Sequence, residues 1–136
     1  MTRVCLDSNV LVAAFAARGL CADLLRTVLA DHQLIVPEVV AEEVRRVLVQ
    51  KIRVSDDDLA SFEAVLERCE IVQRSDTPSP IPIRDPDDEL VLASAIAGRC
   101  RILVTGDDDL LSVAQESPIP ILSPRAFLTL LRSGAS

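Results

Sequence analysis

Short apolar segments alternate with longer amphipathic segments along the chain. The alternation predicts strands at 4–6, 33–36, 70–73, 101–104 and 119–122. Helical spacing or composition predicts helices over 9–17, 21–31, 38–51, 55–66, 86–98, 109–115 and 124–132. Strands that alternate with helices favour an α/β fold, in which helices cover both faces of a mainly parallel sheet.

Local signals support several of these helix boundaries. Ser55 with Asp58 resembles a capping box, and Ser123 before Pro124 is a typical helix start. The run Asp56–Asp58 is explained by the preference of carboxylates for a helix N-terminus. Residues 75–86 hold four of the eight prolines and predict a loop that is too short to separate domains. We therefore expect a single domain over residues 1–136.

The composition narrows the classes of function. Aromatic residues make up only 2% of the chain, so a nucleic-acid reader that stacks bases on aromatic side chains is disfavoured. The net charge of −7 gives no general attraction to phosphate, although clustered acids could form a site that divalent cations neutralise. The four cysteines lack CxxC spacing, so we interpret them as small buried residues in a reducing compartment. With no signal-peptide pattern or spanning apolar run, we expect a cytoplasmic protein without a membrane segment.

Two predicted strands end in acidic residues. Asp7 follows the first strand directly, and Asp107 follows the strand at 101–104 after Thr105 and Gly106. In parallel sheets ligands bind beyond the carboxyl ends of the strands, which makes both acids candidate site residues. An isolated Asp in this position is also a common helix N-cap, but two such placements in one short domain favour a site.

A third acid comes from the helix predicted over 38–51. Its apolar stripe is formed by Val40, Val44, Val47 and Leu48. Glu43 lies at the edge of that stripe and Glu42 nearly opposite, so Glu43 is the candidate ligand and Glu42 the candidate surface charge. An ion pair with Arg45 or Arg46 is the alternative explanation for Glu43.

The helix over 86–98 begins with several acids. Asp85 and Asp87 are explained by capping and by the first helical turn. Asp88 lies on the same side as the apolar residues that must be buried, which makes it the fourth candidate, with Glu89 as the alternative. Asp7, Glu43, Asp88 and Asp107 would form an oxygen-rich site of the kind that Mg²⁺ or Mn²⁺ prefers. Such a site suits hydrolysis of phosphodiesters.

The same segments resemble the motifs of the PIN-domain family, and within it the toxin components of bacterial toxin–antitoxin pairs. The similar segments are Leu6–Val10, Pro37–Leu48, Arg84–Asp88 and Leu103–Leu111. The resemblance implies a three-layer α/β/α sandwich and a ribonuclease that depends on Mg²⁺ or Mn²⁺. It implies that Asp7, Glu43, Asp88 and Asp107 are catalytic and bind metal with Asp109. It also implies a cognate antitoxin and a homodimer.

Further residues would support these ligands or the substrate. Ser8, Asn9 and Thr105 are expected to orient the metal ligands. Substrate-binding residues are unknown from the sequence, and five arginines that it does not rank are candidates for contacts with RNA. They are Arg18, Arg45, Arg46, Arg84 and Arg101.

Two other classes of function remain open at this stage. A phosphatase or phosphoacceptor domain would also place Asp after the first strand, but Asn9 occupies the position of its second acid and Lys51 is the only lysine. A catalytically silent PIN-like scaffold module would share the fold, although such modules usually lack some of the acids.

Overall fold

The computed structural model describes residues 2–134 and contains a five-stranded, wholly parallel sheet. The sheet order is β3-β2-β1-β4-β5, so the first strand lies at the centre. The strands are β1 (Arg3–Leu6), β2 (Gln33–Pro37), β3 (Glu70–Val72), β4 (Ile102–Val104) and β5 (Ile121–Leu122). The parallel sheet predicted from the sequence is thereby confirmed.

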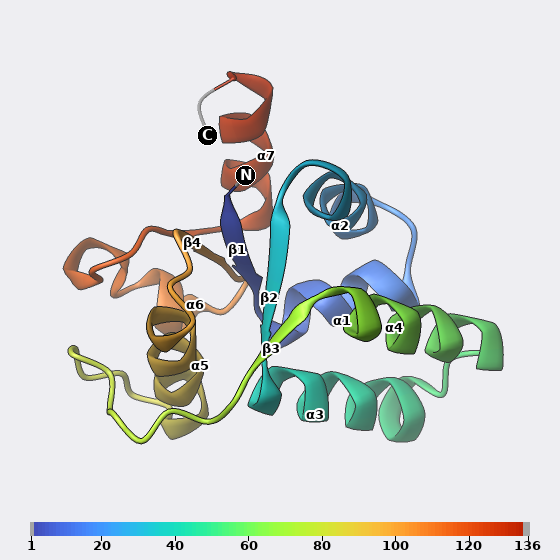
Figure 1. Ribbon diagram of the computed structural model, residues 1–136, viewed down its shortest axis with the longest axis horizontal. Helices are drawn as coiled ribbons and strands as arrows, with labels where there is room; N and C mark the ends of the chain where they lie inside the picture. Colours follow the sequence, from blue (N-terminus) through green and yellow to red (C-terminus); the bar gives the residue numbers. More distant parts are fainter. Residues whose placement is uncertain (1, 135–136) are drawn as a thin grey trace.

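Helices cover both faces of this sheet, which gives the three-layer α/β/α sandwich (Figure 1). The α-helices are α1 (Ser8–Ala16), α2 (Leu20–Asp31), α3 (Glu38–Arg46), α4 (Asp56–Arg68), α5 (Pro86–Ala97), α6 (Asp108–Leu111) and α7 (Pro124–Arg132). Two other helical segments are η1 (Val47–Ile52), a π-helix, and η2 (Ala114–Glu116), a 3₁₀-helix. In Figure 1, α5 and α6 lie on one side of the sheet and α1, α2 and α4 on the other.

The predicted helix starts are confirmed by their caps. The Ser55 hydroxyl accepts a hydrogen bond from the Asp58 N–H at 3.1 Å, and the Ser123 hydroxyl accepts one from the Ala126 N–H at 3.1 Å. The Asp85 carboxylate accepts from the Asp87 N–H at 2.9 Å, which fixes the start of α5. Each cap satisfies a backbone donor that the first helical turn leaves without an intrahelical partner.

The helix predicted over 38–51 has the expected extent but changes its winding. It is α-helical to Arg46 and π-helical from Val47 to Ile52, and Arg53 ends it with a left-handed φ of 57°. Val40, Val44 and Leu48 are all 0% exposed, so the buried stripe runs through both segments. The spacing of apolar residues does not distinguish α-helical from π-helical hydrogen bonding, and for this reason the π-helix was not predicted.

Two predictions near the end of the chain were too long. The strand expected at 119–122 covers only Ile121–Leu122. The side chain of Ser117 bonds both the N–H and the carbonyl of Ile119 and holds that residue in a turn. The helix expected at 109–115 is divided into α6 and η2, because the Val113 N–H bonds the Leu110 carbonyl, three residues back, and does not continue the α-helical pattern.

The core is mainly aliphatic, with two buried phenylalanines. Phe62 of α4 is 0% exposed and packs edge to face on Phe15 of α1, with ring centres 5.4 Å apart. Arg45 of α3 lies 6.0 Å from the centre of the Phe62 ring and forms an ion pair with Glu63 of α4. Phe62 therefore joins α4 to both α1 and α3.

All four cysteines are free thiols, in keeping with their interpretation as packing residues. Cys5 and Cys100 are buried, and Cys21 and Cys69 are half-buried. Burial raises the pKa of Cys69 to about 11, so this thiol stays protonated near neutral pH. It is not a reactive thiolate under those conditions.

Within residues 2–134, no single helix is both long and apolar enough to cross a membrane. α1 and α2 meet the requirement of length and composition only when they are taken together, and they are bent by 105° relative to each other. Both contribute to the hydrophobic core, where Leu11 is 1% and Leu24 is 0% exposed.

We expect Phe62→Ala to lower the free energy of unfolding by about 3–5 kcal/mol, because it removes a fully buried ring and leaves a cavity. Glu67→Ala on the exposed side of α4 is the control, with an expected change within about 0.5 kcal/mol. Urea denaturation followed by circular dichroism measures both values. Equal stabilities would show that α4 does not depend on this contact.

Candidate metal centre

The parallel strands bring the candidate residues to one edge of the sheet. Asp7 directly follows β1, Thr105 to Asp107 follow β4, and β2 leads into α3, which carries Glu43. β1 pairs with both β2 and β4, so these three strand ends are neighbours. The carboxyl edge of the sheet therefore gathers residues that are up to 100 positions apart, as expected for a ligand site in such a fold.

Asp7 is the most firmly held of the acids. Its side chain is buried, at 4% exposed, and it caps α1 by accepting from the Ser8 N–H at 2.7 Å on Oδ1. Oδ2 accepts from the Thr105 hydroxyl at 2.7 Å and from the Asn9 amide at 3.2 Å. Asp7 thus caps α1 and also lies in the cluster of acids at the end of the strands. The cap uses one oxygen, and the contacts with Thr105 and Asn9 use the other.

The pKa of Asp7 is raised above its ordinary value, chiefly because burial penalises the charged carboxylate. The hydrogen bonds from Thr105 and Ser8 act in the opposite direction, and the negative charges of Glu43 and Asp107 raise the pKa further. An environment that opposes ionisation of a buried acid is one that a bound cation would relieve.

Asn9 and Thr105 connect the loops that follow β1 and β4. Asn9 Oδ1 accepts from the Gly106 N–H at 2.8 Å, and the Thr105 hydroxyl accepts from the Asp107 N–H at 3.0 Å. A Cβ atom on Gly106 would lie only 3.2 Å from Asn9 Oδ1, so glycine allows this close approach. The three residues expected to orient the ligands, Ser8, Asn9 and Thr105, therefore all contact Asp7 by hydrogen bonds.

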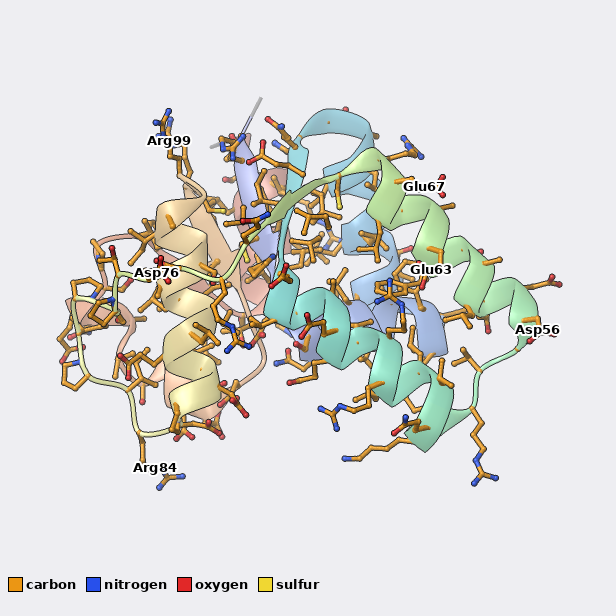
Figure 2. All side chains as sticks on the ribbon, turned by 60° about the horizontal axis from the view of Figure 1, so that its bottom comes forward. Asp56, Glu63, Glu67, Asp76, Arg84 and Arg99 are labelled. Atoms are coloured by element: carbon orange, nitrogen blue, oxygen red, sulfur yellow. The ribbon has the colours of Figure 1, made fainter. Side chains whose placement is uncertain are left out.

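Asp107 and Asp109 lie at the start of α6. Asp107 is the N-cap of this helix and accepts from the Asp109 N–H at 2.8 Å. Asp109 forms a long ion pair with Arg84, with Nη2 and Oδ1 3.4 Å apart. Arg84 projects outward beside the start of α5 and is 87% exposed (Figure 2), so this ion pair contributes little to stability.

Asp88 lies between the other aspartates. Its side chain is 8% exposed, and within the described part of the chain Oδ2 has no hydrogen-bond partner. One oxygen each of Asp7, Asp88 and Asp107 lie within 4.8 Å of one another, and the same holds for Asp85, Asp88 and Asp109. Asp88 thus belongs to both groups of three.

The pKa of Asp88 is raised to about 7, first by burial and then by the neighbouring acids. The charge of Asp107 and a hydrogen bond with it contribute most among these neighbours, followed by the charges of Asp85 and Asp7. A carboxyl with an unpartnered buried oxygen and three acidic neighbours has the donor chemistry of a ligand for a hard cation.

A cleft of about 300 Å³ opens onto these acids. Glu43, half-buried on α3, lies on its wall, whereas the exposed Glu42 lines only the neighbouring cavity. Glu89 lines neither of these two cavities, in contrast to Asp88. The cleft is lined by Asp7, Ser8, Asn9, Val12, Glu43, Val47, Asp87, Asp88, Val91 and Asp107.

The neighbouring cavity, of about 190 Å³, holds two arginines. Arg46 comes from α3, and Arg74 from the segment after β3. Arg46 is one of the five arginines that the sequence offered as candidates for contacts with RNA, whereas Arg74 is not. Arg74 follows a strand just as Asp7 does, and that position was the available signal. Arg101, another of the five, precedes β4 and so lies at the opposite edge of the sheet.

These observations define the class of protein: an α/β protein with a carboxylate-lined cleft at the ends of its parallel strands. The chain matches the PIN domain family over residues 3–109 and belongs to that family. Comparison with curated proteins gave no significant sequence match.

Solved structures share the fold. One is VapBC2 from Rickettsia felis bound to a DNA fragment from their promoter, with a TM-score of 0.62, 18% identity and coverage of 89% of this chain and 97% of that one. Another is VapBC-1 from nontypeable Haemophilus influenzae, with a TM-score of 0.60, 12% identity and coverage of 91% and 99%. A third is the PIN domain endonuclease Utp24, with a TM-score of 0.56, 18% identity and coverage of 89% and 84%. Family and fold together support a nuclease, and so a hydrolase.

We expect Thr105→Val to lower the free energy of unfolding by about 1–3 kcal/mol, because it leaves Asp7 Oδ2 and the Asp107 N–H short of a partner. The pKa of Asp7 should rise further, since the lost hydrogen bond lowers it. Thermal unfolding and carboxyl NMR titration measure the two effects. Thr129→Val, in which an exposed hydroxyl is removed from α7, should change neither.

The metal-free protein should lose stability as the pH rises from about 4 to 7. The pKa of Asp88 is 3.8 ordinarily and about 7 in the fold, so the folded state keeps a proton that the unfolded chain releases in this range. Unfolding therefore becomes more favourable with rising pH. Asp88→Asn should remove much of this dependence and stabilise the protein at pH 8, on the order of 2 kcal/mol.

Urea denaturation in EDTA across this pH range tests the expectation. Asp76→Asn, on the loop before α5, is the control and should follow the wild type (Figure 2). A wild-type stability that rises steadily from pH 4 to 7, with Asp88→Asn behaving identically, would contradict the raised pKa of Asp88.

Proposed function

We propose that this protein is a metal-dependent endoribonuclease and that it is the toxin of a toxin–antitoxin pair. The observation that carries the nuclease proposal is the meeting of Asp7, Asp88 and Asp107 within 4.8 Å, from three separate elements, with Asp88 Oδ2 buried and unpartnered among the described residues. Buried like charges at this separation repel each other strongly unless they share protons or a cation.

In this proposal the aspartates hold Mg²⁺ or Mn²⁺, because carboxylate oxygens are the ligands that these hard cations prefer. Glu43 completes the ligands from α3, and Asp109 joins them once its long ion pair with Arg84 opens. When bound, such an ion stabilises the charge that develops on a phosphodiester during hydrolysis.

The chain's own residues would prepare the site for that ion. The Thr105 hydroxyl and the Asn9 amide hold Asp7 Oδ2, so this carboxylate needs little reorganisation when a substrate arrives. Asp88, with a pKa of about 7, must lose its proton to act as a ligand. Metal affinity should therefore increase as the pH rises through 7.

The partner side of the proposal has a different basis. The fold is shared with chains from VapBC2, VapBC-1 and FitAcB, and the last comes from Neisseria gonorrhoeae. The sequence resemblance to the toxin group of PIN domains also supports an antitoxin partner. We infer a cognate antitoxin that covers the cleft, a homodimer as the assembled form, and a place in the cytoplasm.

Two alternatives are less well supported. A phosphatase with an aspartyl nucleophile needs a lysine near the site, but Lys51, the chain's only lysine, is exposed on η1 and lines neither cavity described above. A silent scaffold module gives no reason for keeping Asp88 buried beside Asp7 and Asp107, an arrangement that raises the pKa of both Asp7 and Asp88.

Purified protein should cleave a mixed RNA pool with Mn²⁺ or Mg²⁺ and not with EDTA. Asp7→Asn should reduce the rate at least about a hundredfold while its circular dichroism stays unchanged, because a ligand held by three hydrogen bonds loses its charge. Gel electrophoresis of the products measures cleavage.

Asp108→Asn is the matched control, since Asp108 is exposed and stands beside Asp107 without lining the cleft. It should keep the wild-type rate. A folded wild-type protein that is inert with either metal would remove the ribonuclease proposal and favour the scaffold.

A further inference from the structure

An acidic nuclease has to hold a polyanion against its own charge. The chain carries a net charge of −7, and the cleft described above is lined by five carboxylates. Metal ions offset part of that charge at the reacting phosphate only, whereas a nucleic-acid strand carries a phosphate at every nucleotide. Cationic side chains beside the cleft are therefore needed to position the rest of the strand.

Several arginines are already engaged elsewhere. Arg3 pairs with Glu70, Arg26 with Asp23 and Arg45 with Glu63. Arg84 pairs with Asp109 at the far end of the acidic cluster. Arg46 and Arg74 differ from these four. Both are exposed, and neither forms an ion pair or side-chain hydrogen bond within residues 2–134.

Arg46 stands next to the candidate ligand Glu43. The two are three residues apart on α3, a spacing that places side chains on the same side of a helix. Both line the cavity of about 190 Å³, and Glu43 also lines the acidic cleft. A group bound by Arg46 would therefore lie directly beside the acids.

Arg74 reaches the same cavity from the sheet. It follows the end of β3 by two residues, and β3 lies two strands away from β1 in the sheet order. Strand spacing places the ends of β3 and β1 about 10 Å apart. Arg74 is thus beyond the metal ligands and on the β3 side of the same edge.

The two cavities share four lining residues and so form one continuous depression. The shared residues are Ser8, Glu43, Asp87 and Val91. The acidic cluster lies beyond the ends of β1 and β4, whereas Arg46 comes from α3, which follows β2, and Arg74 from the segment that follows β3. A chain of phosphates that enters the acidic part can continue toward the arginines without leaving the depression.

We propose that Arg46 and Arg74 form a phosphate-binding pair that holds the RNA backbone next to the cleaved phosphodiester. The proposal rests on the proposed nuclease function, since it assigns this pair to the substrate of the same site. A guanidinium suits the role because its planar donors bind two phosphate oxygens at once and it stays charged at any working pH. The pair reads no base, so it contributes affinity and register and leaves sequence preference to other residues.

The alternative to phosphate binding is that Arg46 and Arg74 form ion pairs with acids of the same cavity. Glu42 and Asp87 line the cavity, and either could have paired with Arg46 or Arg74. Among the described residues they do not form such pairs. The arginines thus keep their donors available to a ligand.

The test measures RNA binding against salt in an Asp7→Asn background with Mg²⁺, so that binding is separated from cleavage. The probe is a fluorescein-labelled RNA of mixed sequence, followed by anisotropy. Arg46→Ala and Arg74→Ala should each reduce the slope of log affinity against log salt by about 0.7, and the double variant by about 1.4. Each should also weaken binding about tenfold at low salt.

Two variants serve as controls for charge and for position. Arg74→Lys should keep the salt slope, because it keeps the charge, while losing affinity through its weaker geometry. Arg101→Ala removes an exposed arginine at the opposite edge of the sheet and should change neither quantity. Circular dichroism and the melting temperature should be unchanged throughout, since all three arginines are exposed.

An unchanged slope in the double variant would overturn the proposal, as would a parent protein without salt-dependent RNA binding. The outcome for the proposed function is separate. Wild-type cleavage with an unaltered double variant would remove the phosphate-binding pair and leave the nuclease. Binding with the expected slopes but no cleavage under any metal condition would remove the nuclease and leave Arg46 and Arg74 as an RNA-binding pair without a cleavage site.

Discussion

The hydrogen bond from Thr105 to Asp7 joins the ends of two neighbouring strands and fixes the geometry on which the acidic site depends. It is 2.7 Å long and buried, and the same hydroxyl accepts from the backbone of Asp107. Because β1 and β4 are parallel neighbours, their carboxyl ends lie side by side at the same edge of the sheet. By bonding both Asp7 Oδ2 and the Asp107 N–H, Thr105 fixes the positions of these two acids, whose negative charges repel each other.

The acids around this hydrogen bond are held in two different ways. Asp7 and Asp107 each cap a helix with one oxygen, so local folding holds both carboxylates before any ligand binds. Among residues 2–134, Asp88 Oδ2 has no hydrogen-bond partner, and burial and the neighbouring acids raise the pKa of Asp88 to about 7. In the proposed metal site, Asp7 and Asp107 would set the position of the cation, and Asp88 would lose its proton when the cation binds.

Much of this arrangement could be predicted from the sequence, because it follows from periodicity. The sheet and the separation of Glu43 from Glu42 follow from which residues must be buried, and the helix caps follow from the local Ser, Asp and Pro signals. The π-helical turn and the short β5 could not be predicted, since apolar spacing carries no information on hydrogen-bond register. Arg74 follows a predicted strand, but the sequence alone does not show that β3 lies beside β2, and so it did not indicate that Arg74 reaches the site.

The central position of β1 has a consequence for how the protein is made. β1 pairs with β2 early in the chain, but its other neighbour, β4, begins only at Ile102. A growing chain can therefore build half of the sheet while Asp7 still lacks Thr105 and Asp107. Since synthesis proceeds from the amino terminus, the carboxylate cluster assembles only after residue 107 has been added. The cluster of Asp7, Asp88 and Asp107 therefore cannot be complete during translation before residue 107 has been added.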